Sequence, residues 1–121
     1  MAKTALVVDD SVSIRQMVTF TLQSAGFTTI EGANGVEALA ATADKTVDLV
    51  VTDLNMPQMD GITLVKELRK RPTFKFTPIL LLTTESQDSK KQEGKAAGAT
   101  GWMVKPFQPD QLLSVVSKVV K

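Results

Sequence analysis

The sequence contains no cysteine and no histidine, and these absences exclude several kinds of chemistry. Without cysteine there is no disulfide and no thiolate metal site. Without histidine, a Ser-His-Asp triad, an imidazole metal site and a phosphohistidine intermediate are impossible within this chain. A metal site here would have to use oxygen ligands.

Long apolar runs and a strong charge of either sign are also missing. No run approaches the roughly 20 residues that a bilayer span needs, and the opening MAKTALVVDD reaches two acids before a signal-peptide core could form. We therefore expect a soluble, cytoplasmic protein with no membrane partner. The net charge of +1 comes with no basic cluster large enough for a nucleic-acid surface.

The 121 residues, 43% of them hydrophobic, suit one domain with one core and no effector domain. Short apolar runs predict strands at Ala5–Val8, Phe27–Ile30, Leu49–Val51, Ile79–Leu82 and Trp102–Val104. Helical spacing between them predicts helices at Ile14–Ala25, Ala38–Ala43, Ile62–Leu68, Gln87–Ala97 and Leu112–Val120.

Strand and helix alternate about five times, which predicts an α/β fold with a mainly parallel sheet and helices on both faces. A barrel would need about 250 residues, so the length excludes it. In an open sheet of this kind ligands bind beyond the carboxyl ends of the strands. The residues that follow the strands are therefore the candidate site.

Three acids, a hydroxyl and a lysine follow the predicted strands. They are Asp9 and Asp10 after the first strand, Asp53 after the third, Thr83 after the fourth and Lys105 after the fifth. Three carboxylates brought together repel one another unless a cation lies among them. Oxygen ligands in a shallow site favour Mg²⁺.

Magnesium held by carboxylates usually serves a phosphate, and the other residues fit that use. Lys105 supplies a positive charge and Thr83 a hydroxyl donor for phosphoryl oxygens. Asp53 is then a candidate nucleophile toward phosphorus. Each residue alone also has a structural explanation, as a helix cap, a turn or solvated surface, and their shared position at the strand ends favours the functional one.

Four motifs resemble the receiver domains of two-component response regulators, most closely the single-domain, CheY-like receivers of chemotaxis. The motifs are LVVDDS (6–11), DLNMPQMDG (53–61), PILLLTTE (78–85) and GATGWMVKPF (98–107). The resemblance covers residues 4–120 and implies a doubly wound five-stranded sheet of order 2-1-3-4-5 with about five helices.

The resemblance also implies roles for the site residues. Asp53 would accept a phosphoryl group from a histidine kinase, and Asp10, Asp53 and the main-chain carbonyl of Asn55 would bind Mg²⁺ directly. Asp9 would act through water. Thr83 and Lys105 would contact the phosphoryl oxygens. The Lys105-Pro106 bond would be cis. Alternatively, Pro106 only marks the boundary between a strand and the following helix.

Trp102 occupies the switch position where the family usually has Tyr or Phe. The resemblance implies that this side chain turns inward when Thr83 moves toward the phosphate. An indole is larger than the ring of Tyr or Phe, and its N–H can only donate a hydrogen bond, so its inward packing must differ in detail. Without the family pattern, Trp102 would be taken as cover for the edge of the core.

The surface of the fourth helix, fifth strand and fifth helix would carry the output. Lys90, Lys91 and Lys95 lie on the fourth helix near Trp102 in this scheme, and we expect the patch to bind an acidic amphipathic segment. The alternative to a binding surface is that the apolar residues of the fifth helix are buried more deeply within the domain. The interior Gly94 costs about 1 kcal/mol relative to alanine, so this helix should shift easily.

The expected setting is chemotaxis, with a histidine kinase as donor, a flagellar switch protein as target, a phosphatase as a further partner, and a monomeric receiver. Asn55 and Glu85 match the pattern of quick self-hydrolysis. A phosphorelay intermediate or phosphate sink is the alternative, and it would hold its phosphate longer.

Two other classes fit less well. A phosphatase of the haloacid dehalogenase type would need an acid two positions after the nucleophile, where this chain has Asn55. A flavodoxin-like protein would need a phosphate-binding loop after the first strand, where Asp9 and Asp10 would repel an anion. We therefore expect a signalling domain that catalyses only its own phosphorylation and dephosphorylation.

Overall fold

The computed structural model describes residues 3–84 and 88–120. In chain order its elements are β1 (Thr4–Val8), α1 (Val12–Ser24), β2 (Thr28–Gly32), α2 (Gly35–Ala41), β3 (Leu49–Asp53), α3 (Gly61–Arg69), the short 3₁₀ helix η1 (Pro72–Phe74), β4 (Ile79–Thr83), α4 (Asp88–Ala97), β5 (Gly101–Val104) and α5 (Pro109–Val119).

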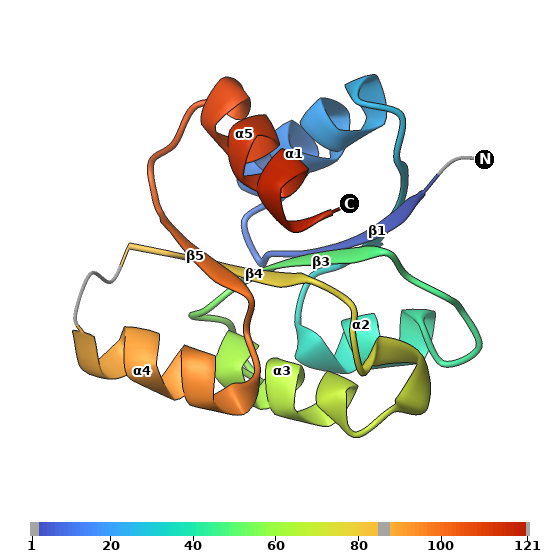
Figure 1. Ribbon diagram of the computed structural model, residues 1–121, viewed down its shortest axis with the longest axis vertical. Helices are drawn as coiled ribbons and strands as arrows, with labels where there is room; N and C mark the ends of the chain where they lie inside the picture. Colours follow the sequence, from blue (N-terminus) through green and yellow to red (C-terminus); the bar gives the residue numbers. More distant parts are fainter. Residues whose placement is uncertain (1–2, 85–87, 121) are drawn as a thin grey trace.

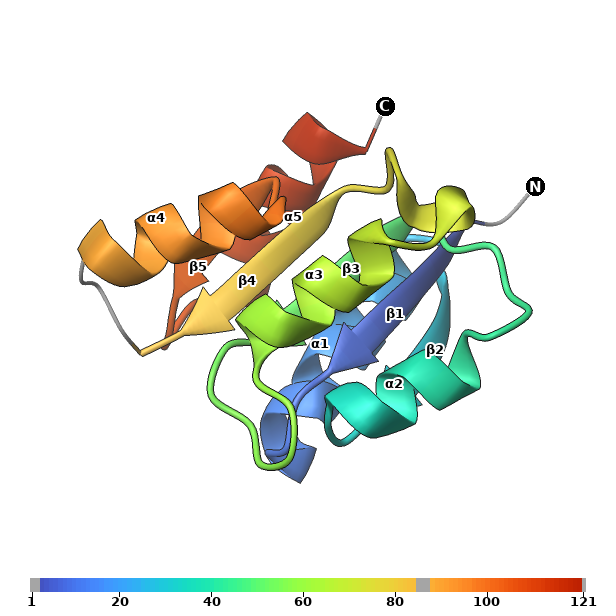
Figure 2. The ribbon, with the colours of Figure 1, turned by 90° about the horizontal axis from the view of Figure 1, so that it is seen from below.

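The five strands form one parallel sheet in the order β2-β1-β3-β4-β5. Helices α1 and α5 cover one face, and α2, α3 and α4 lie side by side across the other (Figures 1 and 2). The strand order reverses between β1 and β3. The doubly wound α/β fold expected from the sequence is confirmed.

The core has two halves, because neighbouring residues of a strand point to opposite faces. Leu6, Val50 and Leu81 pack toward α2, α3 and α4. Val7 and Leu80 pack toward α1 and α5. Every residue of β3 and β4 is buried, which explains why these strands have continuous apolar sequences.

Local signals explain several helix ends. Ser11, Asn34 and Asp60 cap α1, α2 and α3 by accepting a hydrogen bond from a main-chain N–H of the first turn. Gly26 follows α1 with φ of 99°, a conformation that glycine adopts without strain. Helix α2 begins three residues earlier than its apolar spacing predicted, because Asn34 provides the cap.

The main differences from the predicted elements lie at the strand ends. Asp53 and Thr83 are the last residues of β3 and β4 rather than residues that follow these strands, as predicted. The helix η1 was not predicted from the sequence. No helix in the described part of the chain is long and apolar enough to span a membrane.

Candidate functional site

The site lies where β1 and β3 end, at the reversal of strand order. One carboxylate oxygen from each of Asp9, Asp10 and Asp53 lies within 4.8 Å of the others. Asp9 and Asp53 are buried, and Asp10 is exposed. The sheet therefore brings together the three acids expected from the sequence.

Asp9 is held at several atoms. Its main-chain N–H donates to the Gly32 carbonyl at 3.2 Å, beyond the last residue of β1. Its Oδ1 accepts from the Ser11 N–H at 2.9 Å, and its Oδ2 accepts from Lys105 Nζ at 3.0 Å. Both carboxylate oxygens of Asp9 are thus engaged within the protein.

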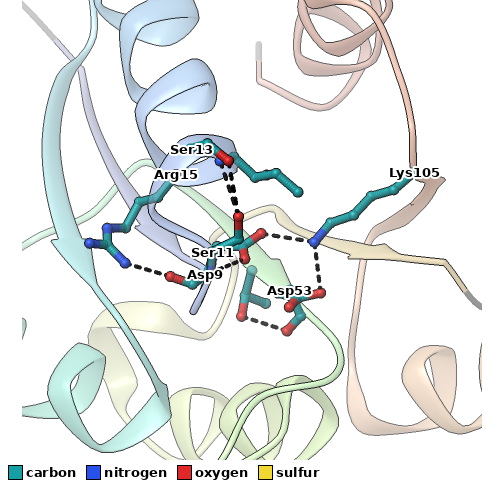
Figure 3. Close-up of polar contacts among 8 residues, drawn as sticks. Asp9, Ser11, Ser13, Arg15, Asp53 and Lys105 are labelled. Carbon is teal, nitrogen blue, oxygen red and sulfur yellow. Dashed lines mark hydrogen bonds and ion pairs between the residues drawn. The ribbon is translucent and has the colours of Figure 1, made fainter.

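Lys105 joins two of the acids (Figure 3). Its Nζ lies 3.0 Å from Asp9 Oδ2 and 3.1 Å from Asp53 Oδ1, so the ammonium bridges two buried carboxylates. Lys105 directly follows β5, and its N–H donates to the Thr83 carbonyl at 2.8 Å. The Lys105-Pro106 peptide bond is cis.

The acids and the lysine shift one another's protonation. Burial raises the pKa of the Asp53 carboxyl to about 6, the charges of Asp9 and Asp10 add to the rise, and Lys105 offsets part of it. Burial alone would lower the pKa of Lys105, but its hydrogen bonds and attraction to Asp9 and Asp53 outweigh burial and raise it. Lys105 is therefore a permanently charged counter-ion for the acids.

Thr83 is the last residue of β4 and is fully buried. It stands opposite Val104 in the sheet, one residue before Lys105. The hydroxyl and the ammonium thus come from adjacent strands at the same edge as the acids.

The loop between β3 and α3 packs directly on the end of β3. The Leu54 N–H donates to the Leu82 carbonyl, and the Gly61 N–H donates to the Leu54 carbonyl, each at 2.8 Å. A methyl group at Gly61 would overlap the main-chain oxygen of Asp53. Asn55 is exposed in this loop, two residues after Asp53. Only glycine at position 61 lets the loop lie this close.

Trp102 lies on β5, half-buried against the core on the side of α3 and α4. Its Nε1 is buried and has no hydrogen-bond partner among residues 3–84 and 88–120. A methyl group at Gly94 would come within 2.6 Å of Leu81 Cδ1 and 3.3 Å of Trp102 Cζ3. Gly94 therefore lets α4 approach the sheet and the indole closely, which is a packing role that helix propensity does not reveal.

The predicted output residues divide between two hollows. Lys91, Lys95 and Trp102 line one hollow of about 280 Å³. Lys90 instead pairs with Glu93 at 3.4 Å and lines a hollow of about 450 Å³ between α3 and α4. Glu85, expected to tune hydrolysis, lies outside the described residues.

Two arginines near the core were not predicted from the sequence to have a role. Arg69, at the end of α3, donates to the carbonyls of Gly98, Phe74 and Thr77 at 2.6–2.7 Å. Arg15, on α1, donates to the Asp9 carbonyl at 2.6 Å. Their partners are main-chain oxygens, which every residue carries and which therefore have no distinguishing mark in the sequence.

Known proteins are similar to this chain in sequence and fold. Residues 5–117 match the family described as response regulator receiver domain. The structure of the chemotaxis response regulator CheY4 of Vibrio cholerae is similar, with 52% identity and a TM-score of 0.94 over 98% of this chain and 99% of that one.

Curated relatives give the same family. The chemotaxis protein CheY1 of Helicobacter pylori is 41% identical over 111 residues, covering 88% of each chain. The phosphate regulon transcriptional regulatory protein PhoB of Pseudomonas aeruginosa is 32% identical over 121 residues, all of this chain and 53% of that protein. The chain spans about half the length of several such transcriptional regulators. It belongs to the receiver domains of two-component response regulators and resembles CheY proteins in its fold.

Proposed function

We propose that the protein is a phosphorylation-activated switch in which Asp53 is the phosphoacceptor. An Asp53 carboxylate oxygen attacks the phosphorus of a phosphohistidine on a kinase, the phosphorus–nitrogen bond breaks, and the imidazole leaves as an acyl phosphate forms. Hydrolysis returns the protein to its unphosphorylated state. Water attacks phosphorus, the bond between phosphorus and the Asp53 oxygen breaks, and the Asp53 carboxylate and inorganic phosphate form. The observation that carries this proposal is the grouping of Asp53 with two further acids and one bridging ammonium.

The acid group fits Mg²⁺. Its donors are oxygens only and lie close together, as a hard divalent cation requires. Asp10, Asp53 and the main-chain carbonyl of Asn55 would bind the ion directly. Asp9 would bind through water, because both of its oxygens already accept hydrogen bonds. When bound, the ion offsets negative charge at the site and on the phosphoryl group.

Thr83 and Lys105 would hold the phosphoryl oxygens. Phosphorylation adds roughly 1.5 to 2 negative charges by the rule for phosphohydroxyls, and Lys105 then exchanges a carboxylate partner for the phosphoryl group. The movement of Thr83 toward the phosphate would shift the position of Trp102. Asn55 and Glu85 would set the rate of hydrolysis.

The output face would be the hollow lined by Lys91, Lys95 and Trp102, without Lys90, which lines the other hollow. Two exposed lysines beside an apolar indole suit an acidic amphipathic segment.

The partners would be a chemotaxis-type histidine kinase, a flagellar switch protein and a phosphatase, acting on a cytoplasmic monomer. Reversing both charges, in Lys91→Glu with Lys95→Glu, should abolish phosphorylation-dependent binding; a partner that still binds would refute this face.

Intact mass spectrometry with acetyl phosphate and Mg²⁺ tests the proposal. The wild type should gain one phosphoryl group and Asp53→Asn should gain none, while Asp44→Asn, at an exposed position away from the site, should behave as the wild type. A wild type that gains no mass, or an Asp53→Asn variant that is phosphorylated equally, would contradict it.

A phosphorelay intermediate is the second candidate, because a receiver domain over residues 5–117 can serve either role. The lifetime of the phosphoryl group separates the two. A chemotaxis switch should lose it quickly, whereas a lifetime of hours would favour the relay.

A further inference from the structure

Arg15 makes a contact that neither its helix nor the sheet requires. Its side chain runs back from α1 to the end of β1, where Nη1 donates to the Asp9 carbonyl at 2.6 Å (Figure 3). Its Nε donates to Glu31 Oε1 on β2 at 3.1 Å. The Arg15 side chain is only 17% exposed, so this geometry is held by its surroundings.

The carbonyl that Arg15 holds belongs to the peptide unit between Asp9 and Asp10. A peptide unit is planar, so fixing the oxygen of Asp9 also fixes the direction of the Asp10 main-chain nitrogen. The main-chain N–H and the two carboxylate oxygens of Asp9 already form hydrogen bonds with Gly32, Ser11 and Lys105. Arg15 holds the carbonyl oxygen of Asp9, in the peptide unit that joins Asp9 to Asp10.

Asp10 depends on this support more than its neighbours do. Asp9 and Asp53 each accept a hydrogen bond from Lys105, whereas the exposed Asp10 carboxylate accepts none within residues 3–84 and 88–120. The direction of the main chain is therefore what points Asp10 toward the other two acids.

We propose that Arg15 is a positioning residue for the divalent cation: by holding the Asp9 carbonyl it orients Asp10 as a ligand. This inference rests on the proposed Mg²⁺ site. Groups that orient metal ligands typically change metal affinity by 10- to 100-fold when they are removed.

Charge and position make opposite predictions for this residue. If Arg15 acted only through its positive charge, its removal would strengthen Mg²⁺ binding, because a cation near the site repels the ion. Removal of the Glu31 charge would weaken binding by the same reasoning. If Arg15 acts by position, its removal weakens binding, and Glu31 matters little.

The test is isothermal titration of Mg²⁺ into the full chain, comparing the wild type with Arg15→Met and Glu31→Gln, at one ionic strength. We expect Arg15→Met to bind about tenfold more weakly and Glu31→Gln to bind within about twofold of the wild type. Thermal unfolding without Mg²⁺ shows whether each variant is folded. If Arg15→Met does not fold, Arg15→Lys replaces it, because its shorter side chain keeps the charge but lacks the planar fork; it should also bind more weakly.

A folded Arg15 variant that binds Mg²⁺ as tightly as the wild type, or more tightly, would overturn the inference. So would a Glu31→Gln variant as weak as the Arg15 variant. A wild type that takes up no Mg²⁺ would instead refute the proposed function, so the two failures are distinguishable.

Discussion

Asp53 is the residue on which stability and chemistry conflict. It is 5% exposed, it lies beside two other acids, and one lysine offsets part of their repulsion. Burial raises its pKa to about 6, so at neutral pH the folded protein carries a carboxylate that would be more stable in water. The same unfavourable charge is what a divalent cation would relieve.

Asp53→Asn should therefore raise the stability of the Mg²⁺-free protein. The carboxyl titrates at 3.8 when unperturbed and at about 6 when folded, so between these values the folded state binds more protons than the unfolded state. The wild type should lose stability as pH rises from about 4 to 6, and Asp53→Asn should exceed it at pH 7 by about 1–3 kcal/mol.

Urea unfolding at pH 4 and pH 7 measures this difference, with Asp44→Asn as the exposed control. If the stability gain of Asp53→Asn over the wild type does not increase from pH 4 to pH 7, the raised pKa of Asp53 is contradicted.

Lys105 should not tolerate even a conservative change. Arginine keeps the charge but replaces a compact ammonium with a planar fork that cannot bridge Asp9 and Asp53 in the same way. We expect Lys105→Arg to reduce the change in Trp102 fluorescence on adding acetyl phosphate and Mg²⁺ by about half or more. Lys118→Arg, on α5, is the control, and an undiminished response in Lys105→Arg would count against the role of the ammonium.

At the scale of elements, the contact between α4 and the sheet depends on Gly94. From the sequence, this glycine suggests a helix that shifts easily, because glycine lowers helix propensity. The structure adds that Gly94 is buried and closely faces Leu81 and Trp102. Helix propensity depends on the residue alone, whereas this packing depends on the strands β4 and β5, which precede and follow α4 in the chain, so no local pattern could have shown it.

Gly94→Ala separates the two effects. Propensity alone predicts that alanine stabilises the helix by about 1 kcal/mol. The overlap with Leu81 predicts a net loss of about 1–3 kcal/mol, as for other overpacked sites, together with a shift in Trp102 emission. Gln92→Ala, on the exposed face of α4, is the matched control for urea unfolding. Higher stability in Gly94→Ala would show that propensity dominates.

At the scale of the whole molecule, the sheet explains why residues far apart in the sequence form one site. Apolar runs and alternating helices were sufficient to predict the parallel sheet and the edge where Asp9, Asp53 and Lys105 meet. Element ends were less predictable, because caps such as Asn34 and the pairing of Asp53 with Leu82 set them. The contacts of Arg15 and Arg69 required the fold itself, since both bind main-chain oxygens, which no residue type in the sequence marks.

Cation binding should stabilise the entire domain, because the three acids converge only when it is folded. Mg²⁺ at about 100 times its dissociation constant should raise the free energy of unfolding by about 2.7 kcal/mol. Asp10→Asn should lose most of this gain, and Asp44→Asn should keep it. Thermal unfolding at increasing Mg²⁺ measures the effect, and equal stabilisation of Asp10→Asn would argue against this site.

The most direct measurement identifies the phosphorylated residue. Borohydride reduces an acyl phosphate of aspartate to homoserine, so the position can be located by peptide mass spectrometry after treatment with acetyl phosphate. The expected result is homoserine at position 53 in the presence of Mg²⁺ and none when EDTA removes the ion. Homoserine at position 9 or 10 instead, or equal conversion of Asp53 with EDTA, would contradict the proposal that Asp53 is the metal-dependent phosphoacceptor.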